Sequence, residues 1–362
     1  MPSSTSSSEH GKLDGDSYER PLPVLNGGVA LAVALLLSAI ALLAWELYWR
    51  DFGVLPGYRN SDARWAEQRR RIDRGEGKRT VIVGSSRLLF DLQLPVWERL
   101  AGERPIQLAL EGTSPVAFLE DLADDPDFTG RLLVGVTPGL FFSGFALRID
   151  ALKHYRKETP AQRSGHRLST WLLEPWLAFY DEDFALVTVL KRQAWPTRPG
   201  VPVREAVRKI SVSAADRNTR MWDKVENDPE YQAMAQRIWA QNFKPLPPEA
   251  LAKAAQTRDE QIDKAVAAVN KLRARGVEVV FVRAPSADRL LEFERASLPR
   301  ESTWDALIAK TGVPGIHFED YPELQGYHVP EWSHLSASEA DRFTAALYPL
   351  TERAFASQAE GD

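Results

Sequence analysis

Residue types that together can carry nucleophilic catalysis stand at two distant places in the chain. Ser85 and Ser86 follow the short apolar run Val81–Val83. Glu331 and His334 lie three residues apart near the C-terminus. A histidine can take the proton of a serine hydroxyl through one ring nitrogen, while a carboxylate holds the other nitrogen and fixes the tautomer. The residues therefore predict acyl transfer through a serine nucleophile.

Both motifs also have structural interpretations. The run Gly84-Ser85-Ser86 can be a strand-ending turn in which a serine caps the following helix. His334 can cap or pack the last helix. Leu88 stands where the nucleophile turn of an α/β-hydrolase needs a glycine, and no Gly-Lys-Ser/Thr follows. Neither that fold nor a phosphate-binding loop is therefore indicated.

Short apolar runs, each ended by glycine, proline or small polar residues, are predicted as strands. They are Thr80–Val83, Ile106–Leu110, Arg131–Val136, Val277–Val282 and Gly315–Phe318. Amphipathic patterns between them, clearest over Asp259–Arg275, predict helices. This alternation indicates an α/β fold with a five-stranded parallel sheet. Ligands bind at the carboxyl ends of such strands, where Ser86 is expected.

The last helix is predicted to begin in Ser336-Ala337-Ser338-Glu339, which fits a capping box and follows His334 directly. Between the third and fourth strands lie about 140 residues, too many for one crossover. We interpret residues 143–250 as a mostly helical insertion over the strand ends, serving as a cap or a partner surface.

In this order, the motifs resemble those of the SGNH/GDSL hydrolase superfamily, from residue 80 to about 355. The resemblance places the nucleophile at Ser86, with Ser85 in place of the family's aspartate. Gly112 matches the second-block glycine, and Thr137 stands at the third-block asparagine. Glu331 replaces the aspartate of an Asp-x-x-His motif. The resemblance implies a flavodoxin-like three-layer sandwich over residues 80–357, interrupted by the insertion.

It also implies roles for these residues. Ser86, His334 and Glu331 would form a catalytic triad. The backbone N–H groups of Ser86 and Gly112, with the hydroxyl of Thr137, would form the oxyanion hole. No cofactor or metal is required for this chemistry.

Two arginines near the predicted strand ends are candidate substrate-binding residues. Arg87 follows the serine and Arg283 ends the fourth strand, so both could recognise a carboxylate or phosphate. Alternatively, each pairs with a structural acid. Asp320 is a reserve candidate for the triad acid, and His317 and His328 lack metal-ligand spacing.

The N-terminal region has a different composition. Residues 1–20 are predicted to be a disordered tail. The next segment, 21–49, holds no charge from Pro21 to Trp45 and ends in Trp45, Tyr48 and Trp49, which is typical of a transmembrane anchor with an aromatic belt. A cleaved signal peptide or a buried soluble helix are the alternatives. Flanking charges do not decide the orientation.

Residues 50–79 are predicted to be a basic linker helix, with either a solvated face or a contact with anionic lipid headgroups. The net charge of −5 gives no electrostatic case for nucleic-acid binding. The chain has no cysteine, so disulfides and thiolate metal sites are excluded and an oxidising compartment is tolerated.

The expected function is that of a membrane-anchored serine esterase or O-acyltransferase that acts on a cell-surface glycan outside the cytoplasm. The architecture resembles accessory proteins of polysaccharide O-acetylation, which work beside a multi-pass membrane acyltransferase. The alternatives are an inactive module that binds polysaccharide or such a membrane partner, and a lysophospholipase or thioesterase.

Overall fold

The computed structural model describes residues 26–193, 195, 198–200 and 205–359, so the expected N-terminal tail lies outside the described residues. The chain divides into two compact units, residues 1–48 and 49–362. The first unit holds most of α1 (Gly27–Asp51), a helix long and apolar enough to cross a membrane. A signal sequence can have the same length and composition.

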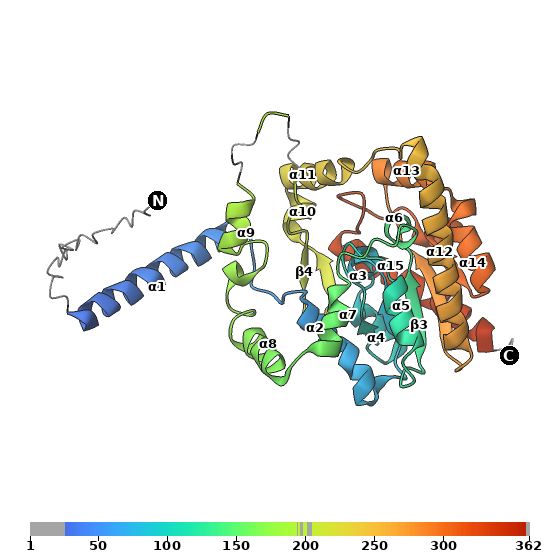
Figure 1. Ribbon diagram of the computed structural model, residues 1–362, viewed down its shortest axis with the longest axis horizontal. Coiled ribbons are helices and arrows are strands. Elements are labelled where there is room, and N and C mark those ends of the chain that lie inside the picture. Colours follow the sequence, from blue (N-terminus) through green and yellow to red (C-terminus); the bar gives the residue numbers. More distant parts are fainter. Residues whose placement is uncertain (1–25, 194, 196–197, 201–204, 360–362) are drawn as a thin grey trace, which may run out of the picture. The chain divides into compact units, whose positions relative to one another are not determined.

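The second unit is built on a five-stranded parallel sheet, which confirms the predicted α/β class (Figure 1). Its strands are β1 (Val81–Val83), β2 (Ile106–Gln107), β3 (Arg131–Gly135), β6 (Glu278–Arg283) and β7 (Gly315–His317). Their order is β2-β1-β3-β6-β7, and each neighbouring pair is parallel. Each observed strand coincides with one predicted run or overlaps it.

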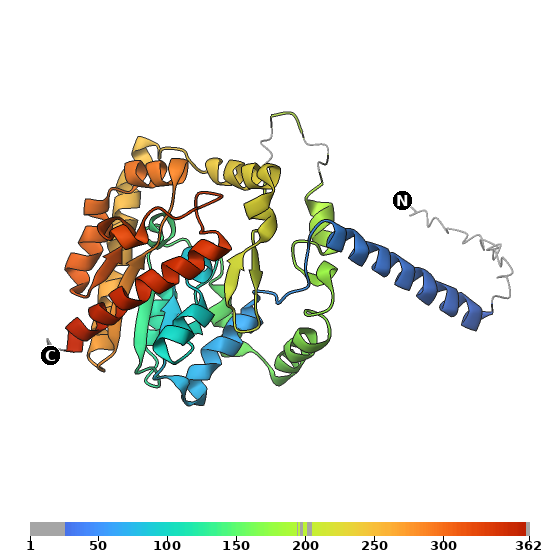
Figure 2. The ribbon, with the colours of Figure 1, turned by 180° about the vertical axis from the view of Figure 1, so that it is seen from behind.

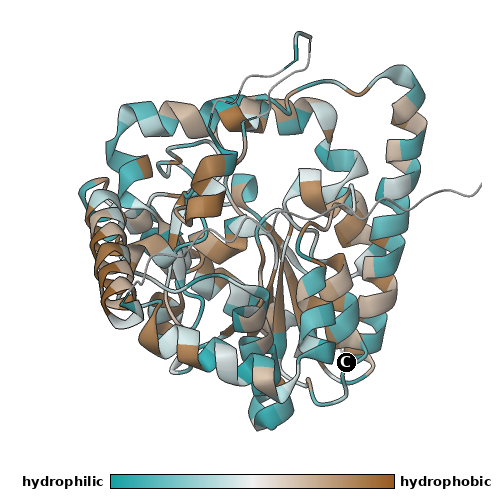
Figure 3. Ribbon diagram, turned by 60° about the vertical axis from the view of Figure 1, so that its left-hand side comes forward, coloured by the Kyte–Doolittle hydropathy of each residue, from teal (hydrophilic) through white to brown (hydrophobic). Residues whose placement is uncertain are grey.

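Helices cover both faces of this sheet. Side chains alternate along the strands, so that Val81 and Val83 belong to one core cluster and Ile82 to the other. The first cluster packs under α2 (Asp62–Arg71), α5 (Val116–Ala123), α12 (Pro248–Arg273) and α14 (Trp304–Thr311). The second packs under α3 (Ser86–Asp91), α4 (Leu94–Ala101) and α15 (Ala337–Ala359). Figure 3 shows the strands as an apolar centre enclosed by helices of mixed polarity.

The last helix and the helix before β6 follow their predicted patterns. The predicted face of α15, Ala340, Phe343, Leu347 and Leu350, is buried. α12 ends close to the predicted position but begins earlier than expected, at Pro248. The remaining elements after β6 are α13 (Asp288–Ser297), η3 (Arg300–Ser302), η4 (Phe318–Asp320) and η5 (Pro322–Leu324).

The basic segment after the apolar helix is part of the folded unit, which corrects the linker interpretation of residues 50–79. Helix α2, followed by η1 (Ile72–Glu76), packs Trp65 into the core, where its indole N–H donates to the carbonyl of Leu108 at 2.9 Å. Arg64, Arg69 and Arg70 are buried in ion pairs with carboxylates of later segments. Their charges are therefore neutralised within the protein, and these three side chains do not face headgroups.

The segment between β3 and β6 is mostly helical, with one hairpin that the sequence analysis did not predict. Before α12, it comprises α6 (Pro138–Phe141), α7 (Asp150–Lys157), α8 (Pro160–Leu172), η2 (Ala178–Tyr180), α9 (Leu186–Lys191), β4 (Ser211–Ser213), β5 (Thr219–Met221), α10 (Asp223–Asn227) and α11 (Pro229–Ala240). From the hairpin turn, the buried Arg217 donates to the carbonyls of Gln107 and Ala109 at 2.6 and 2.7 Å. The insertion is thus fastened to the end of β2.

Candidate active site

The first half of the site lies where β1 and β3 end side by side. Val83 is paired with Val134, so Gly84 and Gly135 follow in the same register. Leu88 of α3 packs directly on Gly135, where a Cβ atom would lie only 2.6 Å from the leucine Cγ. The absence of a side chain at Gly135 therefore lets α3 start against the strand ends. The order of the strands along the chain reverses between β1 and β3, which is where open α/β sheets bind ligands.

Two hydroxyl groups meet at this point. Ser85 is the N-cap residue of α3, but its side chain does not cap the helix. Its hydroxyl is instead hydrogen-bonded to that of Thr137, the residue before α6. Ser86 begins α3 and is half-buried. The structural interpretation of a capping serine therefore does not describe Ser85, and Ser86 and Thr137 lie at the ends of adjacent strands.

The second half of the site is a buried carboxylate–imidazole pair. Oε1 of Glu331 accepts hydrogen bonds from Nδ1 and from the backbone N–H of His334, both at 2.7 Å. Both side chains are almost fully buried. A carboxylate on Nδ1 keeps the proton on that nitrogen, so Nε2 is the nitrogen able to accept one. The pairing expected from the spacing is therefore present.

The turn that carries this pair has an unusual backbone. Trp332 has a φ of +72°, which is rare for a bulky residue. Its carbonyl accepts a hydrogen bond from the N–H of Ala287 at 3.0 Å, and its ring contacts that of Phe243. These contacts hold the turn in a conformation that brings Glu331 and His334 face to face.

Helix α3 joins the two halves. The imidazole of His334 lies on the ring of Phe90, with centroids 4.3 Å apart. Phe90 is one helical turn after Ser86, so both project from the same side of α3. The carboxylate of Asp91 also accepts a hydrogen bond from the N–H of Leu335 at 2.9 Å. The predicted nucleophile and base thus come from segments that pack against each other.

The second ring nitrogen of His334 is not engaged by another described residue. Nε2 is buried and has no hydrogen-bond partner among the described residues. The structure also shows no hydrogen bond between this atom and the hydroxyl of Ser86. Catalytic hydrogen bonds often form only once substrate is bound.

The sequence analysis missed Asp91. This side chain is fully buried, and its Oδ2 has no partner among the described residues. Burial raises the pKa of Asp91 to about 7, although the nearby His334 opposes the shift. The signal in the sequence was a single acid within the apolar stretch from Leu88 to Leu92.

The sequence analysis also missed a contribution from the insertion. The indole N–H of Trp239, on α11, donates to Oε2 of Glu331. On the same helix, the amide of Gln236 donates to the carbonyl of Pro330 at 2.9 Å. The Glu331 carboxylate thus accepts from three donors, namely the Trp239 indole and the ring and backbone N–H groups of His334. The insertion covers this part of the site. No local sequence signal links Trp239 to Glu331.

Gly112 lies just beyond β2, next to the end of β1. The N–H of Leu110 donates to the carbonyl of Gly84 at 3.0 Å, and Gly112 has a φ of +58°, which glycine adopts readily. Residues 112–114 pair with the start of the insertion, where the N–H of Ser114 donates to the carbonyl of Phe145 at 2.6 Å. All three residues assigned to the oxyanion hole therefore lie at the carboxyl ends of the strands.

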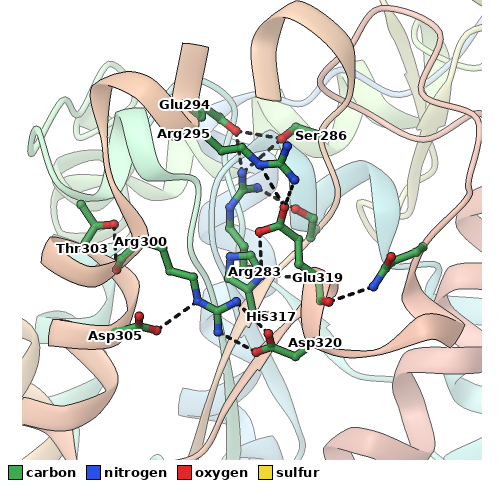
Figure 4. A network of polar contacts seen from close by, with 12 residues as sticks. Arg283, Ser286, Glu294, Arg295, Arg300, Thr303, Asp305, His317, Glu319 and Asp320 are labelled. Carbon is green, nitrogen blue, oxygen red and sulfur yellow. Dashed lines mark hydrogen bonds and ion pairs between the residues drawn. The ribbon is translucent and has the colours of Figure 1, made fainter. Parts of the chain in front are cut away.

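The two predicted substrate-binding arginines are engaged with a shared acid. Nη2 of Arg87 and Nη2 of Arg283 each lie 2.5 Å from the carboxylate of Glu294. Ser286 also donates to that carboxylate, at 2.8 Å (Figure 4). All four side chains are buried. Both arginines thus form ion pairs with a buried acid, as in the alternative interpretation, in which each pairs with a structural acid.

The charges of this cluster support each other. Burial opposes ionisation of Glu294, but Arg283 and Arg87 outweigh it and lower the pKa of the carboxyl to about 2. Burial lowers the pKa of Arg283 to about 10. This value still lies well above neutral pH, where the guanidinium therefore keeps its charge.

The other candidate residues, Asp320, His317 and His328, are not part of the Glu331–His334 pair. Asp320 forms an ion pair with Arg300 at 2.7 Å (Figure 4). Burial, with Arg283 and Arg300 nearby, lowers the pKa of His317 to about 4. His328 is exposed. In the part of the chain that the structure describes, no group of three or more histidine and carboxylate side chains is placed to hold a metal ion.

No protein-family model matches this chain, and the comparison with curated proteins found no match.

Proposed function

We propose that the second unit is an SGNH-type serine esterase or O-acyltransferase that works through an acyl-serine intermediate. The observation that carries the proposal is the buried Glu331–His334 pair. Its imidazole packs on Phe90 of the helix that begins at Ser86, and Nε2 has no hydrogen-bond partner among the described residues. The sheet supports the finer fold assignment, because its strands, counted along the chain, have the order 2-1-3-4-5 of flavodoxin-like folds.

In the proposed mechanism, Nε2 of His334 takes the proton of the Ser86 hydroxyl as its oxygen attacks an ester carbonyl. Glu331 stabilises the imidazolium that forms. The N–H groups of Ser86 and Gly112 and the hydroxyl of Thr137 hold the oxyanion. His334 then returns its proton to the leaving alcohol. Water completes a hydrolysis, and a glycan hydroxyl completes an acyl transfer.

The proposed setting is a membrane surface outside the cytoplasm, with α1 as an uncleaved anchor. The length and composition of α1 support the anchor. An acylated cell-surface glycan is the proposed substrate class, and a multi-pass membrane acyltransferase is the proposed partner for the transferase version.

The test is active-site labelling of the full-length protein in detergent. A fluorophosphonate probe should modify Ser86, as mapped by mass spectrometry, and His334→Ala should abolish the adduct. His328→Ala is the matched control, because His328 is an exposed histidine of the same loop. Equal labelling of His334→Ala and His328→Ala, or an adduct at another serine, would overturn the proposed nucleophile and base.

A second function has its own support. Thr137 replaces an asparagine donor, and its hydroxyl is paired with Ser85, which favours a non-catalytic module that binds polysaccharide or a membrane acyltransferase. That module would bind O-acetylated polysaccharide with no adduct at Ser86. If an adduct does form, comparison of acetyl and long-chain esters separates a glycan esterase from a lysophospholipase or thioesterase.

A further inference from the structure

A large apolar surface is exposed on the insertion, away from the residues of the candidate active site. It consists of Leu168, Trp171, Leu172, Trp176, Leu186, Val187, Leu190 and Trp195, and we call it the α8–α9 surface. Trp171 is 78% exposed and Trp176 is 65% exposed. Soluble monomers rarely leave an apolar area of this kind uncovered, so a partner is expected.

The two helices that carry the surface add no side chain to the core, and α8 contacts α2 through polar side chains such as Thr170, which accepts a hydrogen bond from Arg64 at 2.8 Å. No residue of α8 or α9, both fully described, is buried. Short helices derive most of their stability from packing of an apolar face rather than from propensity. Figures 1 and 2 both show α8 and α9 along one margin of the second unit. The rest of the second unit therefore leaves the apolar faces of these helices uncovered.

Two of the tryptophans of this surface have their indole N–H groups hydrogen-bonded to the backbone. The indole N–H of Trp176 donates to the carbonyl of Trp171 at 3.2 Å, and that of Trp195 donates to the carbonyl of Leu190 at 2.7 Å. The N–H groups of these two rings are thus satisfied by the protein's own backbone, while the rings themselves stay largely exposed. Tryptophan is enriched where proteins meet the boundary between lipid headgroups and acyl chains.

The α8–α9 surface and the segment between its helices contact the first residues of the second unit. The guanidinium of Arg50 donates to the carbonyl of Trp176 at 2.8 Å. The ring of Trp49 packs on Phe184, with centroids 4.5 Å apart. Trp49 and Arg50 are the two residues before the last residue, Asp51, of the apolar helix α1. A bilayer crossed by α1 would have its headgroup region at these two residues.

The segment between the two helices carries Glu174, Asp181, Glu182 and Asp183, and each of these acids is ion-paired within the protein. The helices themselves carry basic side chains, of which Arg163 also lies 3.3 Å from Glu158. α8 carries Arg163 and Arg167, α9 ends in Lys191, and neither helix contains a carboxylate. Basic residues beside exposed tryptophan and leucine are typical of elements that lie in the interface of membranes with anionic lipids.

We propose that the α8–α9 surface lies in the lipid headgroup region and holds the second unit against the membrane. The proposal rests on the spanning of a bilayer by α1, which is part of the proposed function, and it is independent of the serine chemistry. It adds a second contact with the membrane, formed by the folded unit itself.

The experiment uses the full-length protein in vesicles of phosphatidylcholine and phosphatidylglycerol. Because the chain has no cysteine, single cysteines can carry an environment-sensitive fluorophore without background. Leu172→Cys and Val187→Cys report on the surface. Leu251→Cys is the matched control, because Leu251 is a similarly exposed leucine on α12, outside the α8–α9 surface. Leu36→Cys reports on α1.

Lipids that bear a nitroxide near the headgroup should quench the labels at Leu172 and Val187 several-fold more than the label at Leu251. Quenching of the Leu36 label by a deep nitroxide tests insertion of α1 separately. If Leu36 is quenched and the surface labels are not, the membrane contact of α8–α9 is overturned while the anchor stands. Surface labels that are shielded from water but not quenched by lipid would overturn it in favour of a protein partner.

Discussion

Two hydrogen bonds join Glu331 to His334. Oε1 of the carboxylate accepts one from the ring Nδ1 and one from the backbone N–H of the histidine, each at 2.7 Å. The other oxygen accepts the indole N–H of Trp239 from the insertion. The carboxylate therefore fixes the imidazole through the ring and through the backbone at once. Any serine chemistry at this site depends on that orientation, since it leaves Nε2 as the free nitrogen.

Replacing Glu331 with glutamine should slow acylation of Ser86 strongly. The amide cannot stabilise the imidazolium and disturbs the tautomer, an effect worth up to about 10⁴-fold in the rate of serine enzymes. The measurement is the second-order rate constant for fluorophosphonate labelling. Trp239→Phe removes one donor to the same carboxylate and should cost roughly ten- to a hundredfold. Wild-type rates in Glu331→Gln would show that the pair is structural.

Thr137 and Ser85 should differ in their effects on turnover. Thr137→Val removes the hydroxyl proposed to contact the oxyanion, and losing such a donor typically lowers kcat about 10²- to 10³-fold. Ser85→Ala removes only the neighbour that shares a hydrogen bond with Thr137, so its kcat should fall much less. Both are measured with an activated acetyl ester. A Thr137→Val enzyme with unchanged kcat would remove Thr137 from the oxyanion hole.

Asp91 should make folding stability depend on pH. Burial raises the pKa of its carboxyl to about 7, so between roughly pH 4 and 7 the folded protein holds a proton that the unfolded chain has released. Stability is therefore highest below this window and falls as the pH rises through it. The side chain of Asp91→Asn is neutral at every pH. The variant should therefore lack this pH-dependent part of the free energy of unfolding, which is on the order of a few kcal/mol.

Thermal unfolding followed by tryptophan fluorescence from pH 5 to 8 measures the difference. Relative to Asp91→Asn, the wild-type protein should lose Tm toward pH 8. Asp127→Asn, a change at an exposed aspartate, should follow the wild type. Parallel pH profiles of wild type and Asp91→Asn would contradict a raised pKa at Asp91.

Glu294→Gln should destabilise the fold rather than alter substrate binding. It leaves two buried guanidinium groups without their shared carboxylate, and breaking a buried pair costs roughly 3–5 kcal/mol. The free energy of unfolding is measured beside that of Glu323→Gln, which changes an exposed glutamate. If Arg283 instead recognises substrate, a variant such as Arg283→Met would raise KM without a comparable loss of stability.

Much of the fold could be predicted because its signals are local. The strand positions follow from short apolar runs bounded by turn residues, as Val81–Val83 shows. The buried face of α15 follows from helical spacing of Phe343, Leu347 and Leu350. The contact of Glu331 with His334 also spans only three residues, so spacing and turn geometry suffice to expect it.

The assignments that changed concern side chains whose partners lie far away in the sequence. Arg64 and Arg69 read as a basic surface, yet their charges are buried against Glu174 and Asp121, and the partner of Arg64 lies 110 residues later. Nothing in the local composition distinguishes a solvated arginine from one that enters a core with its acid. The same holds for Arg87, whose acid Glu294 is 207 residues away.

The sequence by itself determined the alternation of strands and helices, an apolar helix of membrane-spanning length, and the acid–histidine turn, because each depends on neighbours within a few residues. Only the tertiary structure decided what surrounds that turn. It placed Asp91 beneath the His334 loop, brought Trp239 onto Glu331 and left the α8–α9 surface exposed. These outcomes depend on which distant segments fold over one another, and burial then sets the chemistry of the groups they enclose.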